Sequence, residues 1–111
     1  MKHCMRLQHA PFLAIKAGRK RIEMRLNDDK RSLIKVGDSV EFTDVLTQET
    51  LVCKVLQLHK YASFDELYLH HDKLSLGYEE EENANPDDML VYYPKAEVEK
   101  YGVLGIELDL L

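Results

Sequence analysis

The segments with a clear periodicity are short and change type along the chain, and this limits the possible folds more than any other feature of the sequence. Alternating or strongly apolar runs predict strands over residues 1–7, 21–26, 39–42, 51–61 and 102–108. The last run is so apolar that we expect it to be central to the sheet. Short helical stretches fall between the strands without the regular alternation of a doubly wound sheet. We therefore predict a mainly β domain of the α+β class, in which about five or six strands curl into a small β-barrel with short helices inserted between strands.

Three helical stretches are predicted from their end signals. Residues 11–18 place a proline in the first turn and a glycine at the stop. Ser63 and Glu66 have the spacing of a capping box and predict a helix that runs to about residue 71 or 73. Acidic residues open a third stretch at 87–100 and lysines close it, as the helix dipole favours, and Pro94 either kinks or splits it.

Composition bounds the class of protein and its compartment. The chain has 111 residues, of which 45% are apolar and 32% are charged, and this predicts one globular domain over residues 1–111. It contains no apolar run of eighteen residues and no leader pattern, so we expect a cytoplasmic monomer with no membrane partner. Cys4 and Cys53 are far apart, and no residues have metal-ligand spacing. We therefore expect two free, packed thiols, no metal and no cofactor.

The net charge of −5 hides an uneven distribution. Residues 1–36 carry ten of the fifteen basic residues but only three of the twenty acidic ones, so a segment of charge +7 is followed by one of −12. This predicts a basic face on an acidic body. It also weakens the argument that a negative net charge makes against a nucleic-acid partner.

The strand predicted at 21–26 lies within the basic segment. Its alternation places the apolar residues toward the core and Arg21, Glu23 and Arg25 together on the opposite face. Such a face is usually solvated, and its ion pairs add little stability. The second interpretation is a binding cleft, because four cations gather within ten residues on a helix, a turn and one strand face: Lys16, Lys20, Arg21 and Arg25.

Residues 18–25 match every position of a G-x-K-x-x-E-x-R motif. Other segments follow in matching order, namely Pro11-Phe12-x-x-Ile15 before the motif and Lys35-Val36-Gly37-Asp38, Tyr61-x-Ser63-Phe64-x-Glu66-Leu67 and Tyr101-Gly102-Val103-x-Gly105-Ile106 after it. Together they resemble the ASCH domain, a branch of the PUA-like superfamily, over nearly the whole chain. The resemblance implies a PUA-like small β-barrel with a cleft beside the motif, and an RNA- or nucleotide-binding function with single-stranded RNA or a nucleotide derivative as the partner.

The resemblance and the residue types together give candidate ligand contacts. Cations contact phosphate or a base edge, and an aromatic ring offers a surface for stacking, worth about 1–3 kcal/mol per base. The acidic run at 79–82 is expected to be a solvated loop, with a gate over the cleft as the alternative. The binding candidates are Lys16, Lys20, Arg21, Arg25, Phe12, Tyr61 and Tyr93, with Tyr92 as the alternative to its neighbour and core packing as the alternative for Phe12.

Catalysis at this site is a further hypothesis. Some ASCH-like proteins are N4-acetylcytidine amidohydrolases that use a lysine at the position of Lys20, a threonine nucleophile and a distant glutamate. Here the threonine position holds Glu23, which cannot form the same acyl-enzyme. A Lys20/Glu23 acid–base pair acting on water or on a ribose 2′-hydroxyl predicts instead a small hydrolase or a ribonuclease. The third hypothesis is a protein-interaction module that docks through the charged strand face.

Overall fold

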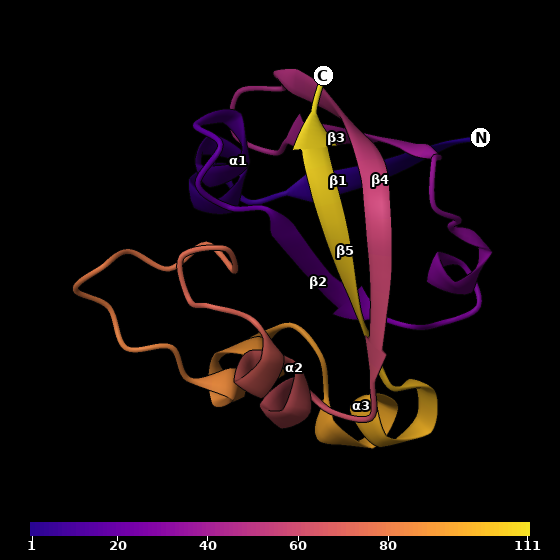
Figure 1. The fold of residues 1–111 in the computed structure, drawn as a ribbon, viewed down its shortest axis with the longest axis vertical. Helices are drawn as coiled ribbons and strands as arrows, with labels where there is room; N and C mark the ends of the chain where they lie inside the picture. Colours follow the sequence, from indigo (N-terminus) through magenta and orange to yellow (C-terminus); the bar gives the residue numbers. More distant parts are fainter.

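A computed structural model describes all 111 residues of the chain. Five strands form one sheet with the spatial order β1-β3-β4-β5-β2 (Figure 1). The strands are β1 (Lys2–Leu7), β2 (Ile22–Leu26), β3 (Ser39–Asp44), β4 (Thr50–Tyr61) and β5 (Val103–Leu110). The helices are α1 (His9–Lys16), α2 (Phe64–His70) and α3 (Lys95–Tyr101), with short 3₁₀ helices at Arg31–Leu33 and Pro86–Val91. None of the helices has the length and apolar character needed to cross a membrane.

The sheet is curled, and its two edge strands approach each other. β1 pairs in parallel with β3, and the other strand pairs are antiparallel. β4, the longest strand, has a bulge between Val55 and Gln57, and such a bulge increases the local twist. Where the edges meet, the Arg25 guanidinium of β2 donates a hydrogen bond of 3.0 Å to the Arg6 carbonyl of β1. This curled half-barrel with short helices confirms the predicted α+β, barrel-like fold.

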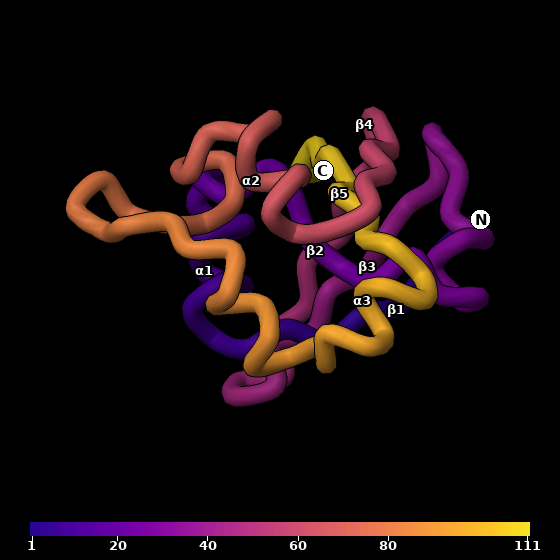
Figure 2. The backbone as a smooth tube through the Cα atoms, turned by 90° about the horizontal axis from the view of Figure 1, so that it is seen from below, coloured from indigo at the N-terminus to yellow at the C-terminus, as the bar shows by residue number.

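Two apolar clusters hold the helices to the sheet. One packs α1 against the sheet and contains the fully buried Phe12, Phe42 and Ile106. The other packs α2, α3 and the segment Pro86–Val91 against β2 and β5, with Leu67 at its centre. Figure 1 shows α1 near one end of the sheet and α2 and α3 at the other, and Figure 2 shows the long connection between α2 and α3 extending to one side. Backbone hydrogen bonds join the chain at the start of β2 both to α1 and to that connection.

The predicted elements are confirmed, with differences at their ends. The Ser63 hydroxyl caps α2 by accepting a hydrogen bond of 3.2 Å from the Glu66 amide. The stretch 87–100 is split at Pro94, because proline has no N–H donor and its ring excludes the preceding turn of helix. β5 has a partner strand on each side, although β4 holds the centre of the sheet.

The two cysteines differ sharply in exposure. Cys53 in β4 is fully buried, whereas Cys4 in β1 is exposed, so the expectation that both thiols are packed is wrong for Cys4. Strands of an edge pair present alternate residues to solvent, and Cys4 falls on the outer side of β1. Burial raises the pKa of Cys53 to about 11 and so suppresses its reactive thiolate.

We predict that a thiol reagent at about pH 8 modifies Cys4 but not Cys53 in the native protein, because only an accessible thiolate reacts. Absorbance after addition of an aromatic disulfide reagent measures the reaction. The Cys4→Ser variant should lose the fast phase and regain one reactive thiol in guanidinium. Fast modification of the native Cys4→Ser protein would contradict the burial of Cys53.

Candidate functional site

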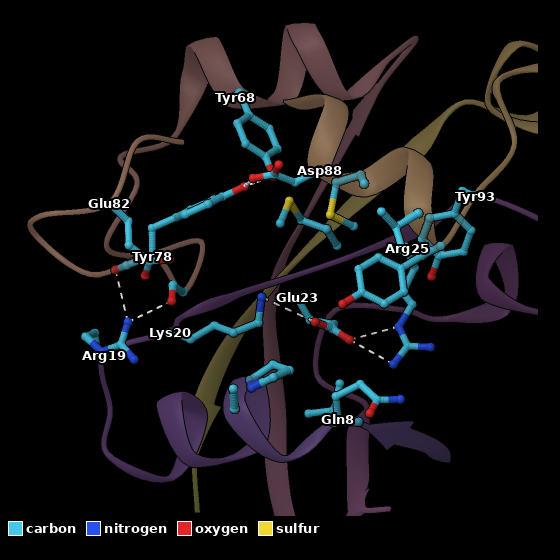
Figure 3. A pocket seen from close by; sticks show the side chains of 18 of the residues that line it. Gln8, Arg19, Lys20, Glu23, Arg25, Tyr68, Tyr78, Glu82, Asp88 and Tyr93 are labelled. Atoms are coloured by element: carbon cyan, nitrogen blue, oxygen red, sulfur yellow. Dashed lines mark hydrogen bonds and ion pairs between the residues drawn. The ribbon is translucent and has the colours of Figure 1, made fainter. Parts of the chain in front are cut away.

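A pocket of about 520 Å³ lies between β2, the start of α1 and the connection between α2 and α3 (Figure 3). This volume is in the range of sites that hold one small organic ligand. Lys20, Glu23 and Arg25 of the motif line one side, and several residues of the stretch 77–93 line another. Gln8, Ala10 and Pro11 at the start of α1 complete the boundary. The pocket therefore depends on segments that are far apart in the sequence.

A buried carboxylate between two cations forms the motif side of the pocket. Glu23 Oε1 lies 3.4 Å from Lys20 Nζ, and Glu23 Oε2 lies 2.8 Å from both Nε and Nη2 of Arg25. The side chains of Lys20, Glu23 and Arg25 are only 5%, 6% and 13% exposed. At such burial an ion without its partner is costly, so the three charges act as a unit. Burial lowers the pKa of Lys20, and the nearby Glu23 opposes this effect without cancelling it.

This arrangement bears on the two interpretations of the charged strand face, a solvated surface and a cleft. The apolar residues of β2 are buried as predicted. Glu23 and Arg25, however, lie under the chain that follows α2, and of the three charged residues only Arg21 is exposed. Strand alternation assigns residues to two faces but does not say which faces a later segment will cover.

A four-residue segment, residues 75–78, is tied to the turn before β2 through every one of its carbonyls, and we call it the strap. The Ser75 carbonyl accepts hydrogen bonds from the backbone amides of Arg21 and Ile22, at 2.8 and 3.0 Å. Lys20 Nζ donates to the Leu76 carbonyl at 3.0 Å. Arg19 Nη1 donates to the carbonyls of the next two residues, 77 and 78, at 2.7 and 3.0 Å. The strap thus fixes where the Lys20 ammonium lies.

Gly77 allows the strap to lie directly on the Lys20 side chain. Its φ is +106°, and a Cβ at this position would lie 3.1 Å from Lys20 Cδ. Both the backbone conformation and the close approach therefore favour glycine.

Three side chains joined by hydrogen bonds form the wall across from Lys20 and Glu23 (Figure 3). The hydroxyls of Tyr68 and Tyr78 lie 2.9 Å apart, and the Tyr78 hydroxyl donates to Asp88 Oδ2 at 2.7 Å. Burial, together with these hydrogen bonds, raises the pKa of Tyr78 well above its ordinary value. Tyr78 therefore stays protonated and acts as a hydrogen-bond donor across the physiological range.

Aromatic rings complete the side of the pocket next to Arg25. Tyr93 lies beside Arg25 in Figure 3, and its ring stacks on Phe64 with centroids 5.9 Å apart. Burial raises the pKa of Tyr93, so its hydroxyl also stays neutral. Tyr92 is 60% exposed and lines the pocket as well, so both neighbouring tyrosines do so.

The charges around the pocket balance. Four basic residues line it, and so do four acidic ones. The acidic residues include Glu79 and Glu82 from the run expected to be a solvated loop, and Asp88 from the segment that follows. The basic first third of the chain therefore does not produce a uniformly basic cleft, because the acidic part folds over it.

The structure brings some of the candidate residues together and places others elsewhere. Lys20, Glu23, Arg25 and Tyr93 line the pocket. The other four candidates do not line it. Phe12 is fully buried in the core, Lys16 pairs with Glu49 at 2.6 Å, Arg21 is exposed, and Tyr61 stacks on His70.

The Tyr68–Tyr78–Asp88 wall and the strap are absent from the sequence-based candidates. No local periodicity marks them, since their partners lie at a distance in the chain. The one local signal is Gly77 followed by an aromatic residue just before the acidic run. No group of three or more His, Cys, Asp or Glu side chains is arranged to hold a metal ion.

We predict that Gly77→Ala destabilises the protein more than Gly18→Ala does. Both glycines have a positive φ, +106° and +80°, but a Cβ at Gly18 would meet nothing within 4 Å. Each variant should lose about 1 kcal/mol for the strained backbone. Gly77→Ala should lose about 1 kcal/mol more, because Lys20 must move. Urea unfolding measures the two values, and equal losses would contradict a strap that fixes Lys20.

Comparisons with known proteins agree with this fold over its full length. The family model described as the ASCH domain matches residues 5–111. The crystal structure of hypothetical protein PH0355 is 31% identical in sequence, with a TM-score of 0.85 and 100% of each chain covered. Protein PF0455 from Pyrococcus furiosus is 30% identical, with a TM-score of 0.72 and coverage of 100% of this chain and 98% of that one.

A more distant structure shares the fold alone. The ASCH protein from Zymomonas mobilis is 12% identical, with a TM-score of 0.67 over 97% of this chain and 66% of its own. A search of curated proteins finds no match. Because the family model matches nearly the whole chain and the curled five-stranded sheet is shared, the chain belongs to the ASCH domain family and has its PUA-like α+β fold.

Proposed function

We propose that the pocket binds one unpaired base of a single-stranded RNA or of a nucleotide derivative. The observation that carries this proposal is the buried Lys20–Glu23–Arg25 group in a pocket of about 520 Å³ beside tyrosine rings. Donors, an acceptor and rings in one pocket are what recognition of an unstacked base requires. Membership of the ASCH family supports the choice of ligand class.

The charge balance favours a base edge over a phosphate as the group that enters the pocket. Phosphate binding needs cations that are not already paired with a carboxylate, whereas Lys20 and Arg25 both pair with Glu23, and the four acidic residues of the pocket balance its four basic ones. Lys20 Nζ has three N–H donors, and Leu76 and Glu23 occupy two of them. Arg25 uses Nε and Nη2 for Glu23 and for the Arg6 carbonyl. The third Lys20 donor remains for a ligand, whereas Arg25 also interacts with the neighbouring Tyr93 hydroxyl.

The tyrosines at the rim supply surfaces for stacking. Tyr93 is held in place by Phe64 at its side, and Tyr92 presents an exposed ring. A base that enters the pocket and a neighbouring base outside it would then each find a ring. Stacking of this kind is worth about 1–3 kcal/mol per base and tolerates any sequence.

We predict that Lys20→Met weakens binding of a single-stranded RNA pentanucleotide about tenfold or more, because a buried donor is lost while the Glu23–Arg25 pair remains. Arg21→Met is the matched control, since Arg21 has the same charge, is adjacent in sequence and lies outside the pocket. It should change the affinity less than about twofold. Fluorescence anisotropy of a labelled RNA measures both. Unchanged binding by the Lys20→Met variant, or a larger loss with Arg21→Met, would contradict the proposal.

Hydrolysis is the second candidate function, and the Lys20–Glu23 contact favours it. A buried lysine with a lowered pKa lies 3.4 Å from a carboxylate, which is the arrangement of an acid–base pair. Glu23 would accept a proton from water or from a ribose 2′-hydroxyl, and Lys20 would donate one to the leaving group. Since Lys20 must be protonated, its lowered pKa would end the activity at a lower pH than an ordinary lysine would.

We predict for this candidate that the protein turns over N4-acetylcytidine or a short RNA, and that Glu23→Gln lowers the rate about 100-fold or more. Glu41→Gln is the control, because Glu41 pairs only with Lys2 on the surface. Chromatography of the products measures the rate. Equal product formation by the wild-type and Glu23→Gln proteins would remove the hydrolase proposal and leave the binding proposal intact.

A protein-interaction module receives no comparable support. The charged strand face that it needs is not an open surface, because Glu23 and Arg25 are buried in the pocket. The monomeric state and the cytoplasmic location stay predictions of the sequence.

A further inference from the structure

The wall across from Lys20 has a fixed direction of hydrogen bonding. The Tyr78 hydroxyl has one proton, and two of its neighbours, the Asp88 carboxylate at 2.7 Å and the Asn85 carbonyl at 3.3 Å, can only accept. That proton is therefore committed to them, and the raised pKa of Tyr78 keeps it in place. The third neighbour, the Tyr68 hydroxyl at 2.9 Å, must then be the donor to the Tyr78 oxygen.

This direction decides what the wall offers to a ligand. The Tyr68 hydroxyl donates its only proton to Tyr78, so its oxygen can form a further hydrogen bond only as an acceptor. The Asp88 carboxylate likewise only accepts, and so do Glu79 and Glu82 at the same side of the pocket. The motif side, by contrast, offers a donor from Lys20. A ligand that satisfies both sides carries a donor toward the tyrosines and an acceptor toward the motif.

We propose that the Tyr68–Tyr78–Asp88 wall makes the pocket select the 4-amino group of cytosine or the 6-amino group of adenine over the corresponding 4-keto and 6-keto bases. This inference rests on the proposed binding of an unpaired base. An amino group donates to the wall, while the adjacent ring nitrogen accepts from the motif side. A keto oxygen in the same place faces only acceptors and negative charge, so the hydrogen bond to the wall does not form. A site built to form a hydrogen bond discriminates strongly against a ligand that cannot form it.

The test compares two pairs of RNA pentanucleotides. Within each pair a keto oxygen replaces the amino group, and the adjacent ring nitrogen changes from an acceptor to an N–H donor. Cytidine is compared with uridine, and adenosine with inosine, which replaces the 6-amino group by a keto oxygen. Calorimetry or fluorescence anisotropy with the wild-type protein should give at least about tenfold tighter binding for the amino member of each pair. Equal affinities, or tighter binding of the keto members, would overturn the inference while leaving base binding intact. No binding of any of the four would overturn the proposed function and this inference with it.

Tyr78→Phe tests the role of the wall itself. The variant keeps the ring but releases the Tyr68 proton, which can then be donated to a keto oxygen, so the amino-to-keto ratio should fall to within about twofold. Tyr101→Phe is the matched control, since Tyr101 lies outside the pocket, and it should keep the ratio. Asp88→Asn is the second variant, and it spares the core because Asp88 is exposed. It should also lower the amino-to-keto ratio, because an amide has N–H donors whereas the carboxylate only accepts. A ratio that survives both changes would overturn the assignment to this wall.

Discussion

The Glu23 carboxylate, buried between Lys20 and Arg25, is the interaction on which the rest of the structure depends. Each cation that contacts it also holds another part of the chain. Arg25 reaches across to the Arg6 carbonyl and joins the edges of the curled sheet, and Lys20 binds the strap. Removing Glu23 would leave two buried cations without their counterion, at a cost of about 3–5 kcal/mol for a pair of this kind. The same carboxylate thus serves the closure of the sheet, the attachment of the strap and the motif side of the pocket.

Much of the fold follows from local patterns in the sequence. The alternation in β2, the capping box of Ser63 and Glu66, and the proline in the first turn of α1 each mark an element that the structure contains. Capping and periodicity are enough to predict these elements, because the interactions that favour them form between residues a few positions apart in the chain. The break at Pro94 is visible in the sequence as well, although only the structure decides between a kink and a split.

The site was predictable only in its motif half. The motif places Lys20, Glu23 and Arg25 correctly near one another, but the strap that holds the Lys20 ammonium lies more than fifty positions later. Phe12 and Tyr61 have rings that could stack on a base, but neither lines the pocket. Phe12 fills the core, and Tyr61 stacks on a histidine. Residue type reports what a side chain can do, whereas its role depends on which distant segment covers it.

The charge distribution of the pocket likewise depends on a segment that is distant in the sequence. The basic first third of the sequence indicates a basic cleft, yet the acidic connection between α2 and α3 folds against it and balances the pocket. A pocket with donors on one side and acceptors on the other suits the edge of a base better than a phosphate. The positive charges that remain outside, at Lys16 and Arg21, belong to an exposed surface.

A crystal structure of the protein bound to a cytidine pentanucleotide tests this account most directly. We expect one unstacked base inside the pocket, with its edge between the Lys20–Glu23–Arg25 group and the Tyr68–Tyr78–Asp88 wall. RNA held outside, through Lys16 or Arg21, with the pocket free of any base, would contradict it.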